Sequence, residues 1–264
     1  MGSKKSVIVI TFVWREMKSM EKMALKCGIK RLGKHPFAVV HPESYSIDYL
    51  KQKYSHIIDV KMSDDHFTSR DSYNEMMLMP DFYRHFQDYD FMLIYQLDAF
   101  VFRDELDYWV AQDYDYIGAP WLPSDSWFQR TIGRLIIRCR KLLPTPDPST
   151  GHIRHADIFF EVGNGGFSLR KISTMIHVLS EKKDFIASLP IGSRARNEDI
   201  VISIILGKMC HLKKPDWQTA ARFSFETNPN HCFRVTKERL PFGCHAWDTS
   251  NWEHFWRGIL WFDE

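Results

Sequence analysis

Short apolar runs alternate with amphipathic stretches along the first hundred residues of the chain. Residues 7–13 and 91–95 are apolar or β-branched almost throughout, which is typical of strands buried on both faces. The predicted strands cover residues 7–13, 37–40, 57–60 and 91–95, and the predicted helices cover residues 16–33, 46–54 and 72–86. Strands that alternate with helices predict βαβ units, and hence an α/β fold with a mostly parallel sheet flanked by helices.

The second half of the chain is less regular and contains one basic amphipathic stretch. Between residues 126 and 143, Arg130, Arg134, Arg138 and Arg140 are interleaved with Ile and Leu, and no acidic residue occurs. A helix of this kind could lie against an anionic membrane surface. It could equally be a solvated basic helix whose apolar side packs on the core. The sequence leaves both interpretations open.

Composition narrows the class of protein further. The chain has 264 residues, a size that fits one large α/β domain or two closely fused halves. Its formal net charge is only +2, which gives no indication of a nucleic-acid partner. The five cysteines are scattered without a Cys-x-x-Cys pair, which favours a reducing compartment. The apolar run at residues 7–13 is too short for a secretory signal core or a membrane span, so we expect a cytoplasmic protein.

Asp98 is the first candidate for chemistry. It follows the apolar run at residues 91–95, and ligands of open α/β sheets bind at the carboxyl ends of the strands. A carboxylate there suits a divalent cation that holds a diphosphate. Position 96 is Gln, so a pair of carboxylates two residues apart is absent. The same residues would also fit a plain buried strand that ends in a solvated Asp.

Two further motifs carry glycines and carboxylates. The adjacent Gly165 and Gly166 after Asn164 would let the backbone pass close to a ligand, although Asn-Gly is also a common turn signal. Glu198 and Asp199 precede an apolar helix, where they could act as a helix cap. In a cleft with little water, one of these carboxylates could instead serve as a general base.

The end of the chain adds a histidine and aromatic residues. His245 lies between Gly243 and Trp247, in a segment that could close over a site, and imidazole is a common partner of metals and phosphates. A lone His is more often a structural residue. Trp121 and Trp247 are candidates for stacking on sugar faces, which aromatic side chains can do.

Taken together, these segments resemble a family of bacterial glycosyltransferase-like proteins that is catalogued as a domain of unknown function and occurs in polysaccharide gene clusters. The resemblance rests on residues 72–74, 95–102, 114–121, 162–170, 197–199 and 242–247. That family is in turn similar to GT-A glycosyltransferases. This implies a GT-A-like, Rossmann-type fold in a single domain, with a nucleotide-sugar-binding half at residues 1–120 and an acceptor-binding half at residues 121–264.

The resemblance also implies roles for individual residues. Gln96 and Asp98 occupy the place of the Asp-x-Asp motif, with Asp98 and His245 as ligands of Mn²⁺ or Mg²⁺, and Gln96 puts the dependence on metal in doubt. Asp199 would be the base, and Glu198 would orient it or bind a donor hydroxyl. The implied donor-binding residues are Thr11, Tyr73, Asn74, Gln96, Asp98, Asn164, Gly165 and Gly166, and the acceptor-binding residues are Trp121 and Trp247.

The function implied is transfer of a sugar from a nucleoside diphosphate sugar to an acceptor hydroxyl, with inversion if the mechanism is a single displacement. The acceptor would be a glycan or a lipid-linked glycan in bacterial surface polysaccharide assembly, reached from the inner face of the plasma membrane. An inert sugar-nucleotide or glycan-binding module is the main alternative, and Gln96 favours it. A nucleotidyl- or phosphosugar transferase is a further alternative, although residues 11–18 lack a Gly-rich, Lys-containing phosphate loop.

Overall fold

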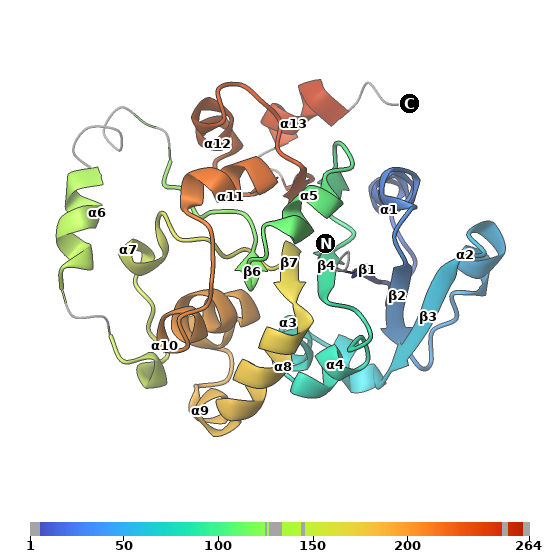
Figure 1. The fold of residues 1–264 in the computed structure, drawn as a ribbon, viewed down its shortest axis with the longest axis horizontal. Coiled ribbons are helices and arrows are strands. Elements are labelled where there is room, and N and C mark those ends of the chain that lie inside the picture. The colour runs from blue at the N-terminus through green and yellow to red at the C-terminus, as the bar shows by residue number, and fades with distance from the viewer. Residues whose placement is uncertain (1–5, 125, 127–133, 144–145, 250–252, 261–264) are drawn as a thin grey trace.

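A mixed sheet forms the centre of the protein (Figure 1). The computed structural model describes residues 6–124, 126, 134–143, 146–249 and 253–260, and within them six strands pair in the order β3-β2-β1-β4-β7-β6. These strands are β1 (Val7–Phe12), β2 (Phe37–Pro42), β3 (Ile57–Met62), β4 (Phe91–Tyr95), β6 (Tyr116–Ile117) and β7 (Phe167–Lys171). β1 to β4 are parallel, and β7 is antiparallel to both of its neighbours. The predicted α/β fold with a mostly parallel sheet is therefore confirmed.

Helices surround this sheet. They are α1 (Ser19–Leu32), α2 (Asp48–Lys53), α3 (Arg70–Met77), α4 (Pro80–Arg84), α5 (Leu106–Ala111), α6 (Arg134–Lys141), α7 (His155–Ile158), α8 (Ile172–Glu181), α9 (Lys183–Ser188), α10 (Gly207–Met209), α11 (Trp217–Phe223), α12 (Pro229–Val235) and α13 (Glu253–Leu260). Shorter turns are η1 (Asp64–Phe67), η3 (Pro148–Thr150), η4 (Arg194–Arg196) and a π-helix, η5 (Ile200–Leu206).

Some elements differ from the prediction. The single helix expected over residues 72–86 is two helices, because Pro80 has no backbone N–H to donate and begins α4 as a new helix. β2 and β3 each continue two residues beyond their predicted ends, to Pro42 and Met62, which pair with each other. The missing N–H of Pro42 removes no hydrogen bond to β1, because the pairing of β2 with β1 ends at Val40.

Both faces of the sheet are buried, as the apolar runs predict. Along β1, Ile8 and Ile10 face a core shared with α3, α4, α8 and η5. The alternate residues Val7 and Val9 face a second core shared with α1, α5 and α11. Because successive strand residues point to opposite faces, an uninterrupted apolar strand requires a helical layer on each side.

A separate small sheet lies beside the central one. Its strands are β5 (Ala99–Val101), β9 (Gly243–His245) and β8 (Ser224–Phe225), in that order across the sheet. β9 is antiparallel to β5 and parallel to β8. A third core, which includes Phe100, Cys244 and Trp256, packs this sheet against α13. The small sheet therefore joins residues near position 100 to the last part of the chain.

α6 stands at one edge of the molecule (Figure 1). It lies within the Arg-rich stretch, whose Arg130 is outside the described residues. Among the helices that the structure describes, none combines the length and the apolar character needed to cross a bilayer.

Candidate functional site

A cavity of about 570 Å³ opens beyond the carboxyl ends of β1 and β4, where Phe12 and the segment after Tyr95 form part of its wall. This is the edge at which open α/β sheets bind ligands. The predicted site residues that line the cavity are Tyr73, Asn74, Gln96, Asp98, Asn164, Gly165, Gly166, Glu198, Asp199 and His245. Residues that are far apart along the chain therefore face one shared space.

Three predicted site residues are placed elsewhere. Thr11 is fully buried within β1, and its hydroxyl has no hydrogen-bond partner. The Trp121 ring packs against Gly163, and Trp247 is only 2% exposed and lies edge-on to Phe100. Both indole rings belong to the core rather than to the wall of the cavity.

The small sheet brings two carboxylates and an imidazole to one corner of the cavity. Asp98 directly precedes β5, His245 ends β9, and Glu226 directly follows β8. Because β5 is antiparallel to the other two strands, these three positions meet at the same end of the sheet. His245 Nε2 is 3.1 Å from Asp98 Oδ1, and His245 Nδ1 is 3.5 Å from Glu226 Oε1.

These charges strongly influence one another. Burial alone would lower the pKa of His245, but Asp98 and Glu226 outweigh it and raise that pKa to about 10. Burial would raise the pKa of Asp98, but the attraction of His245 holds it below its usual value. The imidazole is therefore the cation of this corner. His245 Nδ1 and Glu226 Oε2 are buried without hydrogen-bond partners.

A second pair of charges lies at the back of the cavity. Arg170, on β7, is fully buried, and its Nη2 donates to Glu198 Oε1 at 3.1 Å. The same guanidinium donates to Ser168 Oγ at 3.0 Å and to Tyr83 Oη at 2.8 Å. Glu198 Oε2 is buried with no partner. One oxygen of Glu198 is thus anchored in the core, while the other is free to accept a hydrogen bond from a ligand.

Asp199, next in sequence, has a different environment. Its side chain accepts the Ile200 N–H at 2.8 Å, at the start of η5, so the predicted cap is present. Burial and the charges of Glu198 and Glu226 raise the pKa of Asp199 to about 7. A carboxylate with this pKa can accept a proton near neutral pH, which is the property of a general base. The cap and the base are therefore compatible roles for one side chain.

Glycine is required at positions 165 and 166 because the backbone passes close to two charged side chains. A Cβ atom on Gly165 would lie 1.9 Å from Glu198 Oε1, and one on Gly166 would lie 2.1 Å from His245 Nε2. Both distances are far below van der Waals contact, so a side chain at either position would displace the charged group that it meets. The two glycines allow β7 to enter the sheet between the two charged groups.

Amide side chains fix the positions of these elements. Gln96 Nε2 donates to Tyr73 Oη at 2.8 Å, and Gln96 Oε1 is 3.0 Å from His245 Nε2. Asn164 Oδ1 accepts the Gly166 N–H at 3.0 Å, and Asn74 Oδ1 accepts the Glu198 N–H at 3.4 Å. The amides therefore position the glycine segment and both charge clusters.

Several lining residues are absent from the sequence-based prediction. Glu226 follows β8, which has only two residues and gives too short an apolar run to be recognised. Trp14 is 42% exposed and lines the cavity, unlike the two tryptophans that were predicted. Arg15 forms a bidentate pair with Glu21, whereas Arg70 has no ion pair with any described carboxylate. A Trp-Arg dipeptide directly after a buried strand is the signal that could have indicated Trp14 and Arg15.

Asp98 and His245 fit two positions of a metal-ion shell. Their Oδ1 and Nε2 atoms are 3.1 Å apart, and two donors at right angles on Mg²⁺ or Mn²⁺ are separated by about 3 Å. Within the part of the chain that is described, no three His, Cys, Asp or Glu side chains are grouped to hold a metal ion. The other ligands would therefore have to come from a bound diphosphate and water.

Residues 57–245, more than half of the chain, match the model of a family described as a protein of unknown function, DUF5672. The chain belongs to this family. No curated protein matches the chain. Among solved structures, the apo-form glycosyltransferase GlyE of Streptococcus pneumoniae TIGR4 is similar, with a TM-score of 0.45 and 12% sequence identity. The similarity covers 91% of this DUF5672 chain and 54% of the GlyE chain, so this chain spans about half the length of that protein.

Proposed function

We propose that this protein is a glycosyltransferase that moves a sugar from a nucleoside diphosphate sugar to an acceptor hydroxyl. The observation that carries the proposal is the convergence of Asp98 and Asp199 on one cavity, where the pKa of Asp199 is raised to about 7. In such a cavity, one carboxylate can hold a cation against a diphosphate, and the other can accept the proton of an alcohol.

In this mechanism, Asp199 accepts the proton of the acceptor hydroxyl as its oxygen attacks the anomeric carbon of the donor. The new C–O bond forms while the bond to the diphosphate breaks, and the diphosphate leaves with the electron pair. A single displacement of this kind inverts the configuration at the anomeric carbon. Glu198, anchored through Oε1 by Arg170, would accept a donor hydroxyl on Oε2.

Other residues on the cavity wall suit the remainder of the donor. Arg70 is exposed and is not paired with a described carboxylate, so it is available to bind a phosphate oxygen. Trp14 offers an exposed aromatic face on which a nucleotide base can stack. Asp98 and His245 would hold Mn²⁺ or Mg²⁺, which neutralises the charge that develops on the leaving diphosphate. Gln96, already bonded to Tyr73, would help to hold His245 in place.

The test is a panel of nucleoside diphosphate sugars, each with and without Mn²⁺, offered to the full chain with glycan acceptors. Two measurements are needed: the shift in melting temperature, and the release of nucleoside diphosphate. We expect one donor to raise the melting temperature and to be turned over. Asp199→Asn should keep the donor-induced shift and lose about 100-fold or more in turnover, because proton transfer typically contributes 10²–10⁴-fold. The exposed Asp88→Asn is the matched control.

Two results would contradict the proposal. Turnover by Asp199→Asn at the wild-type rate would remove Asp199 as the base. Donor binding without turnover across all acceptors would instead support an inert sugar-nucleotide-binding module.

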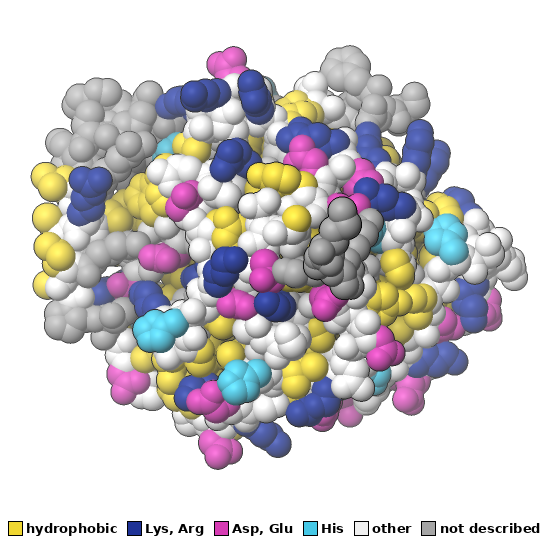
Figure 2. Space-filling model, viewed as in Figure 1, with side chains coloured by type: hydrophobic (Ala, Val, Ile, Leu, Met, Phe, Trp, Pro, Cys, Tyr) yellow, Lys and Arg dark blue, Asp and Glu magenta, His cyan; other side chains and the backbone are white. Residues whose placement is uncertain are grey.

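We further propose that α6 and the two residues after it, Leu142 and Leu143, contact an anionic membrane, where a lipid-linked acceptor would reside. Ile137 is buried, but Leu135, Leu142 and Leu143 are 62%, 86% and 56% exposed. Figure 2 shows hydrophobic side chains along the outer edge of α6. Arg138 and Arg140 are exposed on the same helix, so apolar and basic groups are presented together.

Co-sedimentation with vesicles tests this contact. We expect binding to phosphatidylglycerol vesicles at low salt and much weaker binding to phosphatidylcholine vesicles. The double variant Leu142→Ser, Leu143→Ser should lose most of the binding, while Ile191→Ser, at another exposed apolar residue, should not. Absence of binding by the wild type at low salt would rule out the contact.

A further inference from the structure

A second cavity, of about 740 Å³, lies at the other end of the small three-stranded sheet. Arg103 follows β5, Arg222 precedes β8, and Leu240 precedes β9, and all three line this cavity. Arg103 Nη2 donates to the Leu240 carbonyl at 2.9 Å, which links two of these segments. The sheet therefore separates this cavity from the corner that contains Asp98.

The charges of the second cavity are predominantly positive. Arg103, Arg222, Lys237 and Arg239 line it, together with a single carboxylate, Glu105. Glu105 forms an ion pair with Arg103. No carboxylate of the described residues pairs with the other three cations, and all three are exposed. Like charges held close together without acidic partners create a local positive potential that attracts anions.

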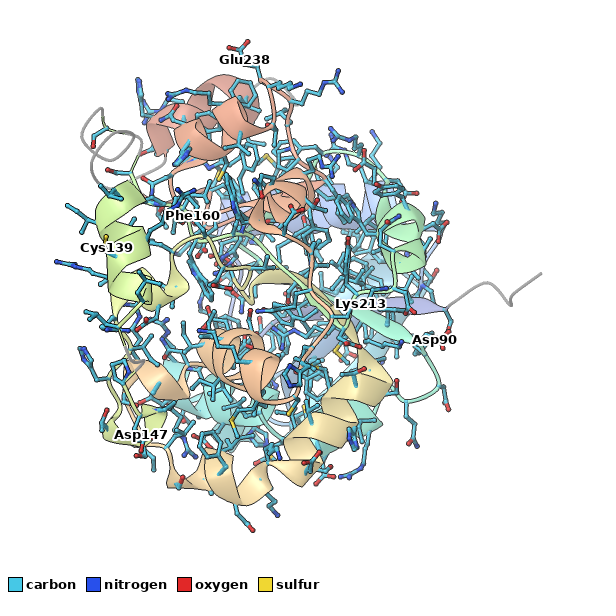
Figure 3. All side chains as sticks on the ribbon, turned by 60° about the vertical axis from the view of Figure 1, so that its left-hand side comes forward. Asp90, Cys139, Asp147, Phe160, Lys213 and Glu238 are labelled. Atoms are coloured by element: carbon cyan, nitrogen blue, oxygen red, sulfur yellow. The ribbon has the colours of Figure 1, made fainter. Side chains whose placement is uncertain are left out.

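The loop after α12 presents two of these cations. Lys237 has a φ of 55°, and the next residue, Glu238, has a φ of 60°. Non-glycine residues rarely adopt such angles. Figure 3 shows Glu238 projecting outward at the edge of the molecule, and it does not line the cavity. Figure 2 shows Lys and Arg side chains gathered over α11, α12 and α5, the elements around this loop.

Aromatic and polar groups complete the wall. Tyr108 is 53% exposed and offers a ring face. Trp109 is 2% exposed, and its indole N–H is buried without an acceptor. Leaving a buried donor unpaired costs about 1–3 kcal/mol, so this group is expected to be satisfied when the cavity is filled. Gln218 and Thr236 supply additional hydrogen-bonding groups.

We propose that this second cavity binds a saccharide that carries an oxyanion, either a carboxylate or a phosphate. The unpaired cations bind the oxyanion, as guanidinium and ammonium groups do. The Tyr108 ring packs against the sugar, and the Trp109 N–H donates to one of its oxygens. The cavity volume lies in the range of small-molecule sites, which favours one or a few sugar units over a long polyanion. The proposal does not depend on the reaction at Asp98.

Isothermal titration calorimetry with the full chain at low salt tests the proposal. The probes are glucuronate, glucose 6-phosphate, neutral glucose and inorganic phosphate. We expect the two anionic sugars to bind and glucose to bind at least about 10-fold more weakly. Arg222→Ala and Lys237→Ala should each weaken the anionic sugars by about 10-fold, in line with the loss of a charge-assisted hydrogen bond. Lys183→Ala, an exposed lysine on α9 at the opposite end of the molecule, should have no effect.

Two further measurements distinguish a saccharide site here from general attraction of anions and from binding in the first cavity. Trp109→Phe keeps a ring but removes the N–H, and it should weaken binding several-fold while the melting temperature confirms folding. Saturating UDP, directed at the first cavity, should leave binding of glucose 6-phosphate unchanged. Equal affinity for inorganic phosphate and glucose 6-phosphate would overturn the assignment to a saccharide. Full binding by both Arg222→Ala and Lys237→Ala, or binding of RNA or anionic vesicles without any of the sugars, would overturn the site.

Discussion

The carboxylates on the two sides of the candidate cavity have different counter-charges. Glu198 is paired with Arg170, a guanidinium that lies entirely in the core behind the wall. Asp98 and Glu226 are paired with His245, whose imidazole is itself part of the wall. One side therefore has its cation outside the ligand's reach, and the other has its cation in contact with whatever the cavity binds.

This difference indicates that the Arg170 side supports the fold and that the His245 side is suited to binding a ligand. Arginine stays charged at any accessible pH, and Arg170 also bonds Ser168 and Tyr83, so it cannot respond to a ligand. His245 is positively charged only while its imidazole carries a second proton, and a metal ion or another cation can take the place of that proton. His245 Nδ1 also has no hydrogen bond and faces only Glu226 Oε1 at 3.5 Å. We therefore expect substitutions on the Arg170 side to act mainly on folding, and those on the His245 side mainly on ligands.

The sharpest test is Arg170→Met. It leaves Glu198 as a buried carboxylate without a counter-charge, which typically costs about 3–5 kcal/mol in the free energy of unfolding. Urea denaturation at pH 7 measures the loss. Adding Glu198→Gln should recover part of it, because the uncompensated charge is then removed. Arg84→Met, which breaks an exposed pair with Asp81, is the control and should cost less than about 1 kcal/mol. A similar, small cost for Arg170→Met would contradict the comparison.

Asp199→Asn should stabilise the protein at pH 8. In the folded protein, the raised pKa keeps a proton on Asp199 up to about pH 7, whereas the unfolded chain releases it near pH 4. The folded state binds more protons in this interval, so this group makes stability fall as the pH rises from about 4 to 7. Asn removes that fall, and we expect a gain of about 2 kcal/mol at pH 8 and little change at pH 4.

Urea denaturation at both pH values measures this difference, with Asp88→Asn as the exposed control. A variant less stable than the wild type at pH 8 would show that Asp199 does not experience the repulsion of Glu198 and Glu226. Together with the loss of turnover expected for the same variant, a gain in stability would mark Asp199 as a residue retained for function rather than for folding.

Local sequence signals were sufficient to predict much of the fold and part of the site. The position of Asp98 follows from the apolar run of β4, and the glycines before β7 indicate a close approach that the structure places beside Glu198 and His245. Pro80 is a signal that could have divided the predicted helix, because proline begins a helix far more readily than it continues one.

Other residues could not be predicted because their positions depend on distant parts of the chain. Arg170 would be expected to lie on a solvent-facing side of its strand, yet it is fully buried, since Glu198 and Tyr83 arrive from other elements to bind it. Tryptophans can pack in a core or line a ligand site, and sequence alone does not reveal that Trp121 and Trp247 pack in the core. Glu226 depends on β8, a two-residue strand formed only by pairing with β9.

Gly166→Ala tests how tightly the two sides are held together. The added Cβ would meet His245 Nε2 at 2.1 Å, so the imidazole has to move away from Asp98 and Gln96. We expect a loss of about 1–2 kcal/mol in the free energy of unfolding, typical of overpacking, and loss of donor binding. Gly258→Ala is the matched control, because its Cβ would meet nothing within 4 Å on α13. That change should be neutral or stabilise by about 0.5–1 kcal/mol.

Glu226→Gln should have the smallest effect on folding. Glu226 Oε1 is 3.5 Å from His245 Nδ1 and attracts the imidazolium, but the charge of Glu226 also repels Asp199. Its removal therefore loses one favourable interaction and relieves one unfavourable interaction. We expect a change below about 1 kcal/mol in urea denaturation at pH 8, similar to the exposed Glu43→Gln. The charge of Glu226 also raises the pKa of Asp199, so its removal should move the pH-dependent fall in stability to lower pH. If Glu226→Gln instead costs as much as Arg170→Met, then the two sides of the cavity contribute equally to folding, and the comparison between them fails.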